Sequence, residues 1–222
     1  MLRQNYEKDL QNMRNNVIRM NEVSIEMFEY YTKYFWKPDE WLEEKLLKMT
    51  TQQDSLEDEI EKLATRIITL QQPVSKETRE ILCAVRIAVS LKKICDHVAD
   101  ISEYASVCQD RIQRDSEEFG VLKQMSEKAL TMIQGAYEAY KTRDYAKAVL
   151  TAKMDDEIDY IFRKIRDKIE EEEPQNRASL CSMMLANHIE RICDHAANIC
   201  EEIVYLENYE LIRLNPKSSS KS

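Results

Sequence analysis

Apolar residues recur at helical spacing along nearly the whole chain, which predicts an all-helical protein. In the first segment they stand three or four positions apart, as at Met13, Val17 and Met20. Stretches rich in Glu, Lys, Leu, Ala and Met favour helix on propensity as well. Two glycines and four prolines are too few for an all-β protein, which needs frequent turns. The pattern predicts six helices, at about 2–35, 40–71, 75–111, 116–143, 144–172 and 176–208.

One helical segment occurs twice, and this repeat predicts the architecture. Residues 90–105 read SLKKICDHVADISEYA and residues 188–203 read HIERICDHAANICEEI, so Ile-Cys-Asp-His recurs at a shift of 98 residues. The preceding helices match at a shift of 105 residues, and a loop absorbs the difference. We expect Asp39 and Ser75 to cap the helices that follow them.

Two tandem three-helix bundles related by internal pseudo-symmetry follow from this repeat. The first bundle is predicted over residues 1–112 and the second over residues 113–212. The remaining segment, 213–222, offers almost nothing to bury and is expected to be a disordered tail.

The last helix of the second repeat carries polar residues on one face. At about 100° per residue, Asp194, Asn198 and Glu201 fall within about 80° of Glu190. The apolar residues of this helix lie on the opposite side. We therefore expect the carboxylates to face away from the core or towards its edge.

A second acidic pair stands on the helix before. Asp155 and Asp159 are four residues apart and share a face, and an antiparallel neighbour would bring them against Glu190 and Asp194. Four carboxylates at close range repel one another unless they are protonated or neutralised. A divalent or trivalent cation with oxygen ligands resolves that repulsion, and the hard candidates are Mg²⁺, Mn²⁺, Ca²⁺ and Fe³⁺.

The first repeat offers fewer acids at the equivalent places. Thr50 and Lys92 replace two of them, and Lys92 can supply an internal ammonium where the second repeat would hold an ion. We therefore expect the second-half site to be the stronger one. The remaining candidate ligands of the first half are Asp54, Asp96, Asp100 and Glu103. With 41 acids in the chain, an alternative is a metal-free acidic face that binds a basic partner.

The histidines and cysteines suggest structural roles. His97 and His195 follow the motif aspartates at the edge of the acidic face, and we interpret them as packing residues or as residues that orient ligands. His188 lies towards the apolar side and is interpreted as structural. The six cysteines stand singly with no paired spacing, which favours reduced, buried thiols over a disulfide framework.

Charge and hydropathy exclude several classes of function. A net charge of −9 argues against nucleic acid and against anionic lipid as partners. No apolar run is long enough to cross a bilayer and no signal peptide is visible, so a cytoplasmic protein is expected, which reaches a membrane only through protein partners. A di-metal enzyme of the ferritin type needs Glu-x-x-His pairs, and none occurs. Catalysis is therefore the weakest interpretation, and we expect no enzyme.

The acidic segment resembles a known family. Residues 189–201 read IERICDHAANICE, similar to the E-R-I-G-D-H-A-x-N-I-x-E of the PhoU family of phosphate-transport regulators, with Cys193 in place of the usual glycine. Residues 91–96, LKKICD, are a weaker first copy, and the resemblance covers about residues 3–210.

This resemblance implies a fold of two similar three-helix bundles and a function in phosphate homeostasis. PhoU-like proteins bind metal ions or multinuclear clusters at the acidic motifs, which makes Mg, Mn, Fe or Zn the expected cofactor. The resemblance also implies a homodimeric negative regulator that contacts a cytoplasmic subunit of a phosphate ABC transporter and a sensor histidine kinase. Accessory proteins of other phosphate transporters are an alternative within the same family.

Overall fold

The computed structural model describes residues 2–34, 40–71, 73–108, 110–171, 177–208 and 214. These residues form an all-α protein without strands, as predicted. The described part of the chain contains seven helical segments, which are α1 (Leu2–Tyr34), α2 (Glu40–Gln71), α3 (Ser75–Cys108), α4 (Glu117–Thr142), α5 (Tyr145–Lys153), α6 (Asp155–Glu171) and α7 (Arg177–Asn208).

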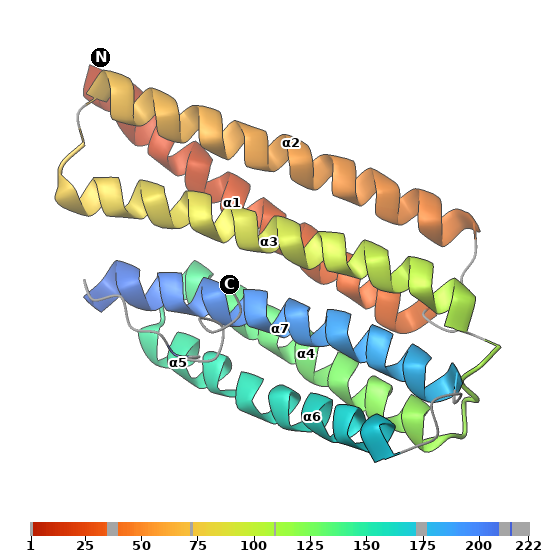
Figure 1. Cartoon of the computed structure of the whole chain (residues 1–222). Helices are drawn as coiled ribbons and strands as arrows, with labels where there is room; N and C mark the ends of the chain where they lie inside the picture. Colours follow the sequence, from red (N-terminus) through yellow and green to blue (C-terminus); the bar gives the residue numbers. More distant parts are fainter. Residues whose placement is uncertain are drawn as a thin grey trace.

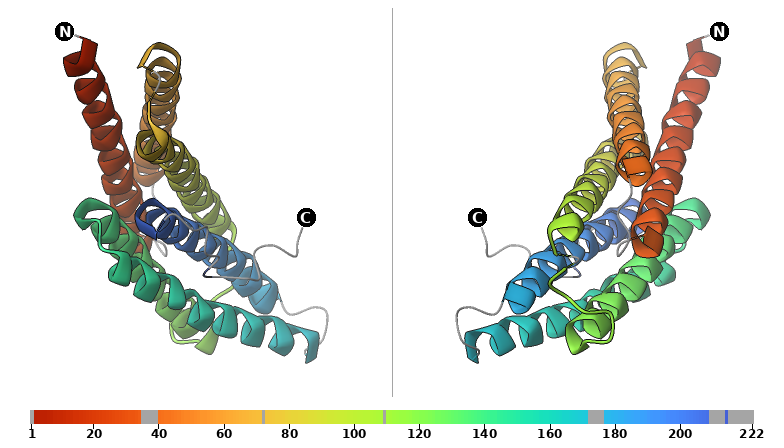
Figure 2. Two further views of the ribbon diagram at one scale, coloured as in Figure 1. Left: turned by 90° about the vertical axis from the view of Figure 1, so that its left-hand side faces the viewer. Right: turned by 90° about the vertical axis from the view of Figure 1, so that its right-hand side faces the viewer.

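The helices form two groups, which pack against each other mainly through α3 of the first group and α7 of the second. Helices α1, α2 and α3 contact one another, and α4, α5 and α6 contact α7 (Figure 1). Helix α3 lies against α7, and the two run in opposite directions between the two groups (Figures 1 and 2). The buried apolar side chains form one continuous core through both groups. The predicted arrangement of two three-helix units is therefore present, with α5 and α6 acting as one helix of the second unit.

That predicted helix, 144–172, is divided at Met154. The backbone N–H of Met154 donates to the carbonyl of Thr151 at 3.1 Å, and the N–H of Glu157 donates to the carbonyl of Met154 at 3.2 Å. Both bonds join residues three apart, as in the tighter 3₁₀ turn. The acids of the next turn, Asp155 to Glu157, favour a new helix N-terminus because they complement the helix dipole. The spacing of apolar residues alone does not reveal this break.

Local capping explains where the second group begins. Ser116 precedes α4 and its side chain accepts a hydrogen bond from the N–H of Phe119 at 3.2 Å. Asp144 precedes α5 and accepts from the N–H of Lys147 at 2.9 Å. Between them Arg143 takes a left-handed conformation, with φ of 54°, that ends α4.

The predicted ends of the first group differ slightly from the structure. Helix α3 begins at Ser75 itself, so Ser75 is the first helical residue and not the cap. The residue before it, Val74, donates its N–H to the Glu77 carboxylate at 3.1 Å. The helix ends at Cys108 and not near residue 111. The expected cap at Asp39 and nearly all of the expected tail at 213–222 lie outside the described residues.

The expectation of six reduced thiols is wrong for one pair. Cys108 at the end of α3 and Cys181 near the start of α7 form a disulfide, with their Cα atoms 5.7 Å apart and a sequence separation of 73. The antiparallel packing of α3 on α7 brings these two ends together, which spacing along the chain cannot show. The other cysteines are buried free thiols, at Cys83, Cys95, Cys193 and Cys200. Among the described residues, no helix has the length and hydropathy needed to span a membrane.

Candidate metal centre

Four acidic side chains of the second repeat act electrostatically on the thiol of Cys193 on α7. The thiol is fully buried, and this burial, reinforced by the negative charges of Asp155, Asp194, Glu190 and Asp159, raises the pKa of Cys193 well above its usual range. Helices α6 and α7 contact each other, so each contributes one acidic pair to this place. All four residues that the sequence predicts as the stronger site therefore lie within electrostatic reach of this one thiol, and their role as ligands stays a prediction.

Two of these acids are more deeply buried than predicted. Asp155 is 1% exposed and Glu190 is 8% exposed, so Glu190 does not face away from the core, and of the two expected positions only the edge of the core fits it. The reason is the position of α7, which contacts α3, α4, α5 and α6 and therefore has few solvent-facing positions. Asp159 and Asp194 are partly exposed, although the Asp194 side chain, at 14%, is only slightly more exposed than that of Glu190, at 11%.

Arg191 lies beside the cluster on the same helix. Its Nε atom is 3.5 Å from Oε2 of Glu190, and its Nη1 atom is 3.2 Å from Oδ2 of Asp194. One guanidinium therefore contacts an acid on each side of it along α7.

The other two candidates of the second half lie further along α7. Asn198 is one turn beyond Asp194, a rise of about 6 Å, and Glu201 is two turns beyond it, a rise of about 10 Å. Glu201 accepts a hydrogen bond from the backbone N–H of Leu214 at 2.7 Å, so it is engaged with the segment after α7. The predicted role of Asn198 and Glu201 as ligands stays a prediction.

In the first half, the ammonium group of Lys92 occupies the corresponding place. Its Nζ atom is 2.6 Å from Oδ1 of Asp54 and 3.7 Å from Oδ1 of Asp96. The hydrogen bond to Asp54 raises the pKa of Lys92. Lys93 lies 3.4 Å from Oδ2 of Asp96, so two lysines balance two aspartates here. The first half thus supplies its own cations.

The buried cysteine of the first repeat also has different neighbours. Cys95, equivalent to Cys193, receives a hydrogen bond from the Gln53 side-chain amide at 3.1 Å and lies 3.4 Å from the Ser24 hydroxyl. The shift of 105 residues places Ile158 where the first half has Gln53. Cys95 is therefore hydrogen-bonded to neutral groups and lies near charges of opposite sign, Asp96 and Lys92, whereas four acids act on Cys193.

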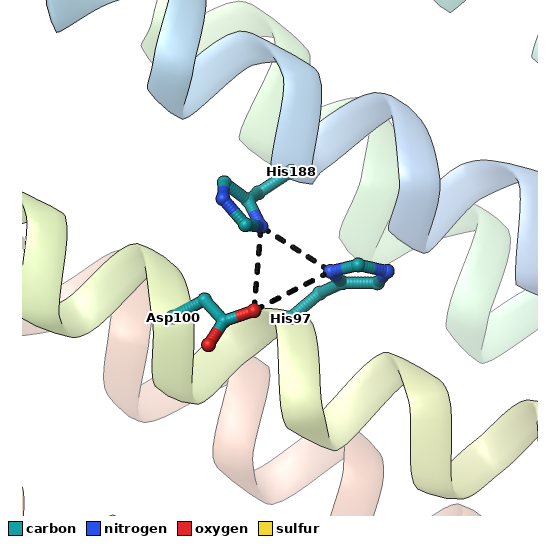
Figure 3. Close-up of side chains that lie close together, drawn as sticks. All are labelled: His97, Asp100 and His188. Atoms are coloured by element: carbon teal, nitrogen blue, oxygen red, sulfur yellow. Dashed lines mark hydrogen bonds and ion pairs between the residues drawn. The ribbon is translucent and has the colours of Figure 1, made fainter.

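The last two candidate ligands of the first half, Glu103 and Asp100, have surroundings different from those of Asp54 and Asp96. Glu103 is exposed on α3. Asp100 turns towards two histidines, with its Oδ2 atom 3.8 Å from Nδ1 of His97 and 3.7 Å from Nδ1 of His188 (Figure 3). Sequence reasoning missed this trio because His188 belongs to the other repeat. The signal that was available is the repeat itself, since equivalent central helices pack against each other.

Comparison with known protein families decides the relationship of this chain. The model of the PhoU domain matches residues 17–105 and 122–203, which covers most of both halves. The chain belongs to the PhoU family. This confirms the resemblance carried by the Ile-Cys-Asp-His repeat and its neighbouring acids.

PhoU relatives with assigned names match along almost the full chain. A protein of Clostridium acetobutylicum, named phosphate-specific transport system accessory protein PhoU homolog, is 26% identical over 223 residues, which cover 97% of this chain and 100% of the relative. Homolog 1 of the same name from Thermotoga maritima is 29% identical over 207 residues, covering 91% and 88% of the two chains.

Solved PhoU structures share the fold. PhoU from Pseudomonas aeruginosa superposes with a TM-score of 0.81 at 20% identity, covering 90% of this chain and 98% of that one. The phosphate transport system regulatory protein PhoU from Streptococcus pneumoniae gives 0.79 at 21% identity, covering 93% and 99%. The PhoU architecture therefore persists in this chain although most residues differ.

Proposed function

We propose that this chain is a metal-binding accessory protein of a phosphate transport system, which acts as a negative regulator between the transporter and a sensor kinase. Family membership and the names of the relatives support the pathway. The observation that carries the metal dependence is the acidic cluster, defined as Asp155, Asp159, Glu190 and Asp194 around Cys193.

The residues of the acidic cluster fit a hard cation. Carboxylate oxygens are the ligands that Mg²⁺, Mn²⁺ or Fe³⁺ prefer in proteins. Asp155 and Asp159 of α6 would hold the ion from one side, and Glu190 and Asp194 of α7 from the other. A bound cation would offer open coordination positions to oxygen atoms of a partner. The first half does not fit the same role, because the ammonium of Lys92 already lies between Asp54 and Asp96.

Contact with a membrane should go through a protein partner. The net charge of −9 opposes binding to anionic lipid, and no described helix is suited to span a bilayer. We propose a cytoplasmic subunit of the transporter as that partner, with Asp159 and Asp194 of the acidic cluster in the contact. A homodimer is part of the same proposal, and analytical ultracentrifugation at several protein concentrations tests it.

Co-sedimentation with membrane vesicles tests the transporter contact. The native chain should sediment with vesicles that contain the phosphate transporter and stay in solution with plain anionic vesicles. The double variant Asp159→Asn with Asp194→Asn should bind the transporter vesicles more weakly. The matched control is Asp54→Asn with Asp96→Asn, which changes the equivalent positions of the first repeat and should retain binding.

The possible results separate the two main alternatives. Binding that survives both the Asp159/Asp194 change and removal of metal by a chelator would support a metal-independent adaptor instead. Sedimentation with plain anionic vesicles would refute the requirement for a protein partner. Negative regulation is tested in cells: deleting the gene should switch on a phosphate-starvation reporter in high phosphate, and an unchanged reporter would contradict that role.

A further inference from the structure

Three side chains of types that ligate metals meet at the packing surface between α3 and α7, and none of them belongs to the acidic cluster. His97 and Asp100 stand one turn apart on α3, and His188 faces them from α7 (Figure 3). The two Nδ1 atoms of His97 and His188 are 3.2 Å apart. The Oδ2 atom of Asp100 lies 3.8 Å from one and 3.7 Å from the other. One donor atom from each residue thus forms a small triangle.

The distances within this triangle are close to those between three ligand atoms on one face of a tetrahedral metal site. Two zinc–nitrogen bonds of about 2.0–2.1 Å at the tetrahedral angle place their nitrogens about 3.3–3.4 Å apart. The observed separation of the two imidazole nitrogens is 3.2 Å. The carboxylate oxygen is a few tenths of an ångström further than the same geometry requires, and rotation of the Asp100 side chain, which is 49% exposed, can close that gap.

The surroundings hold the two imidazoles in place. The His195 ring stacks on His97, with centroids 5.7 Å apart and planes 24° apart. The Tyr104 ring lies 5.2 Å from that of His188. The two side chains are 22% and 16% exposed, so they are held by packing yet remain reachable. Burial lowers the pKa of both His97 and His188.

We propose that His97, Asp100 and His188 form a binding site for a borderline transition-metal ion, with Zn²⁺ as the best-fitting one, separate from the acidic cluster. Two imidazoles and one carboxylate favour zinc-like ions over Mg²⁺, whereas four carboxylates favour hard ions. Three protein ligands leave a fourth position for water or for a group of a partner. The ion would join α3 of the first repeat to α7 of the second. This proposal stands whether or not the acidic cluster binds metal.

Cobalt absorption and zinc titration test the site in the full chain. Co²⁺ replaces Zn²⁺ and gives visible absorption bands that report nitrogen ligation and coordination number. The native chain should develop these bands and should bind one Zn²⁺ that displaces the Co²⁺. His188→Asn should remove the bands and weaken Zn²⁺ by at least roughly 100-fold, since changes to groups that only support a ligand already cost 10–100-fold.

Two further variants keep the test decisive. Asp100→Asn changes an exposed side chain, so it should weaken Zn²⁺ while leaving the melting temperature of the metal-free protein unchanged. His195→Asn is the control, because this histidine stacks on His97 but offers no ligand to the trio; it should retain the cobalt bands. The acidic-cluster variant Asp159→Asn with Asp194→Asn should also retain them.

Three outcomes would overturn the proposal. The first is native affinity for Zn²⁺ in both His188→Asn and Asp100→Asn, which would show that the trio is a hydrogen-bonded cluster only. The second is loss of Zn²⁺ binding from the acidic-cluster variant alone, which would assign the ion to the acids. The third is a cobalt spectrum of six-coordinate oxygen ligation in the acidic-cluster variant, in which the trio alone is left to bind the ion.

Discussion

Converting the first half into a metal site tests whether Lys92 is what distinguishes the two repeats. The change is Thr50→Asp with Lys92→Glu, which gives the first repeat the acids that the second has at Asp155 and Glu190. It is made in a chain whose own acidic cluster is disabled by Asp159→Asn and Asp194→Asn, so that any response to Mn²⁺ comes from the new site.

The structure sets the expected magnitude. Lys92 lies 2.6 Å from an oxygen of Asp54 and 3.7 Å from one of Asp96, and all three side chains are partly exposed. Each such ion pair contributes up to about 1 kcal/mol, and a like-charge contact in its place is unfavourable by a similar amount. Without metal, the converted chain should lose about 3 kcal/mol of unfolding free energy. For a chain of this length that lowers the melting temperature by roughly 6–12 °C.

Melting curves with and without Mn²⁺ provide the assay. At a free Mn²⁺ concentration 100 times its dissociation constant, binding to the native state adds about 2.7 kcal/mol, which restores most of the loss. Lys92→Met in the same background is the control, since it removes the ammonium without adding an acid and should respond to Mn²⁺ weakly. A converted chain that folds but melts at the same temperature with and without Mn²⁺ would refute the reasoning.

Two further predictions concern contacts that hold the helices together. Glu80 is buried and accepts a hydrogen bond from Arg14 at 2.8 Å; burial raises the pKa of Glu80, but the Arg14 hydrogen bonds lower it overall. Glu80→Gln should therefore cost about 2 kcal/mol of unfolding free energy above the ordinary glutamate pKa of about 4.3, and progressively less below it. Urea unfolding at several pH values measures this cost, and an equal loss at pH 3 and pH 7 would contradict the prediction. A methyl group on Gly135 would meet the Thr151 hydroxyl oxygen at 2.6 Å, so Gly135→Ala should destabilise the fold by about 1–3 kcal/mol. Adding Thr151→Ala should relieve most of that loss, and Gly120→Ala, whose new methyl group would meet nothing within 4 Å, should not destabilise the fold. A Gly135→Ala variant as stable as the native chain would disprove the close approach of α4 and α5.

Much of the fold was predictable because the information is local or repeated. Apolar spacing located the helices, and the duplicated Ile-Cys-Asp-His segment indicated two similar units. The division at Met154 was missed because apolar positions continue through it in helical register, and only the backbone hydrogen bonds show the tighter turn. The split of the chain into bundles at residue 112 stays a prediction.

The candidate site was predictable only within one pair of neighbouring helices. The pairing of Asp155 and Asp159 with Glu190 and Asp194 follows from spacing and antiparallel packing. The burial of Glu190 does not, because a helical wheel assumes one buried face while α7 has neighbours on several sides.

Contacts between the two repeats were beyond such reasoning. The Cys108–Cys181 disulfide and the His97–His188 contact each join residues far apart in sequence, and both depend on how α3 crosses α7. Treating each repeat separately therefore made the histidines look structural and the cysteines look unpaired.

Calorimetric titration of Mn²⁺ tests the central claim, that the acidic cluster of the second repeat binds metal and its first-half counterpart does not. Mn²⁺ is the suitable probe because it prefers carboxylate oxygen to imidazole more than Zn²⁺ does. The account predicts that Asp159→Asn with Asp194→Asn abolishes most of the binding heat, whereas Asp54→Asn with Asp96→Asn leaves it nearly unchanged. Equal losses from the two double variants, or native binding in the first, would contradict it.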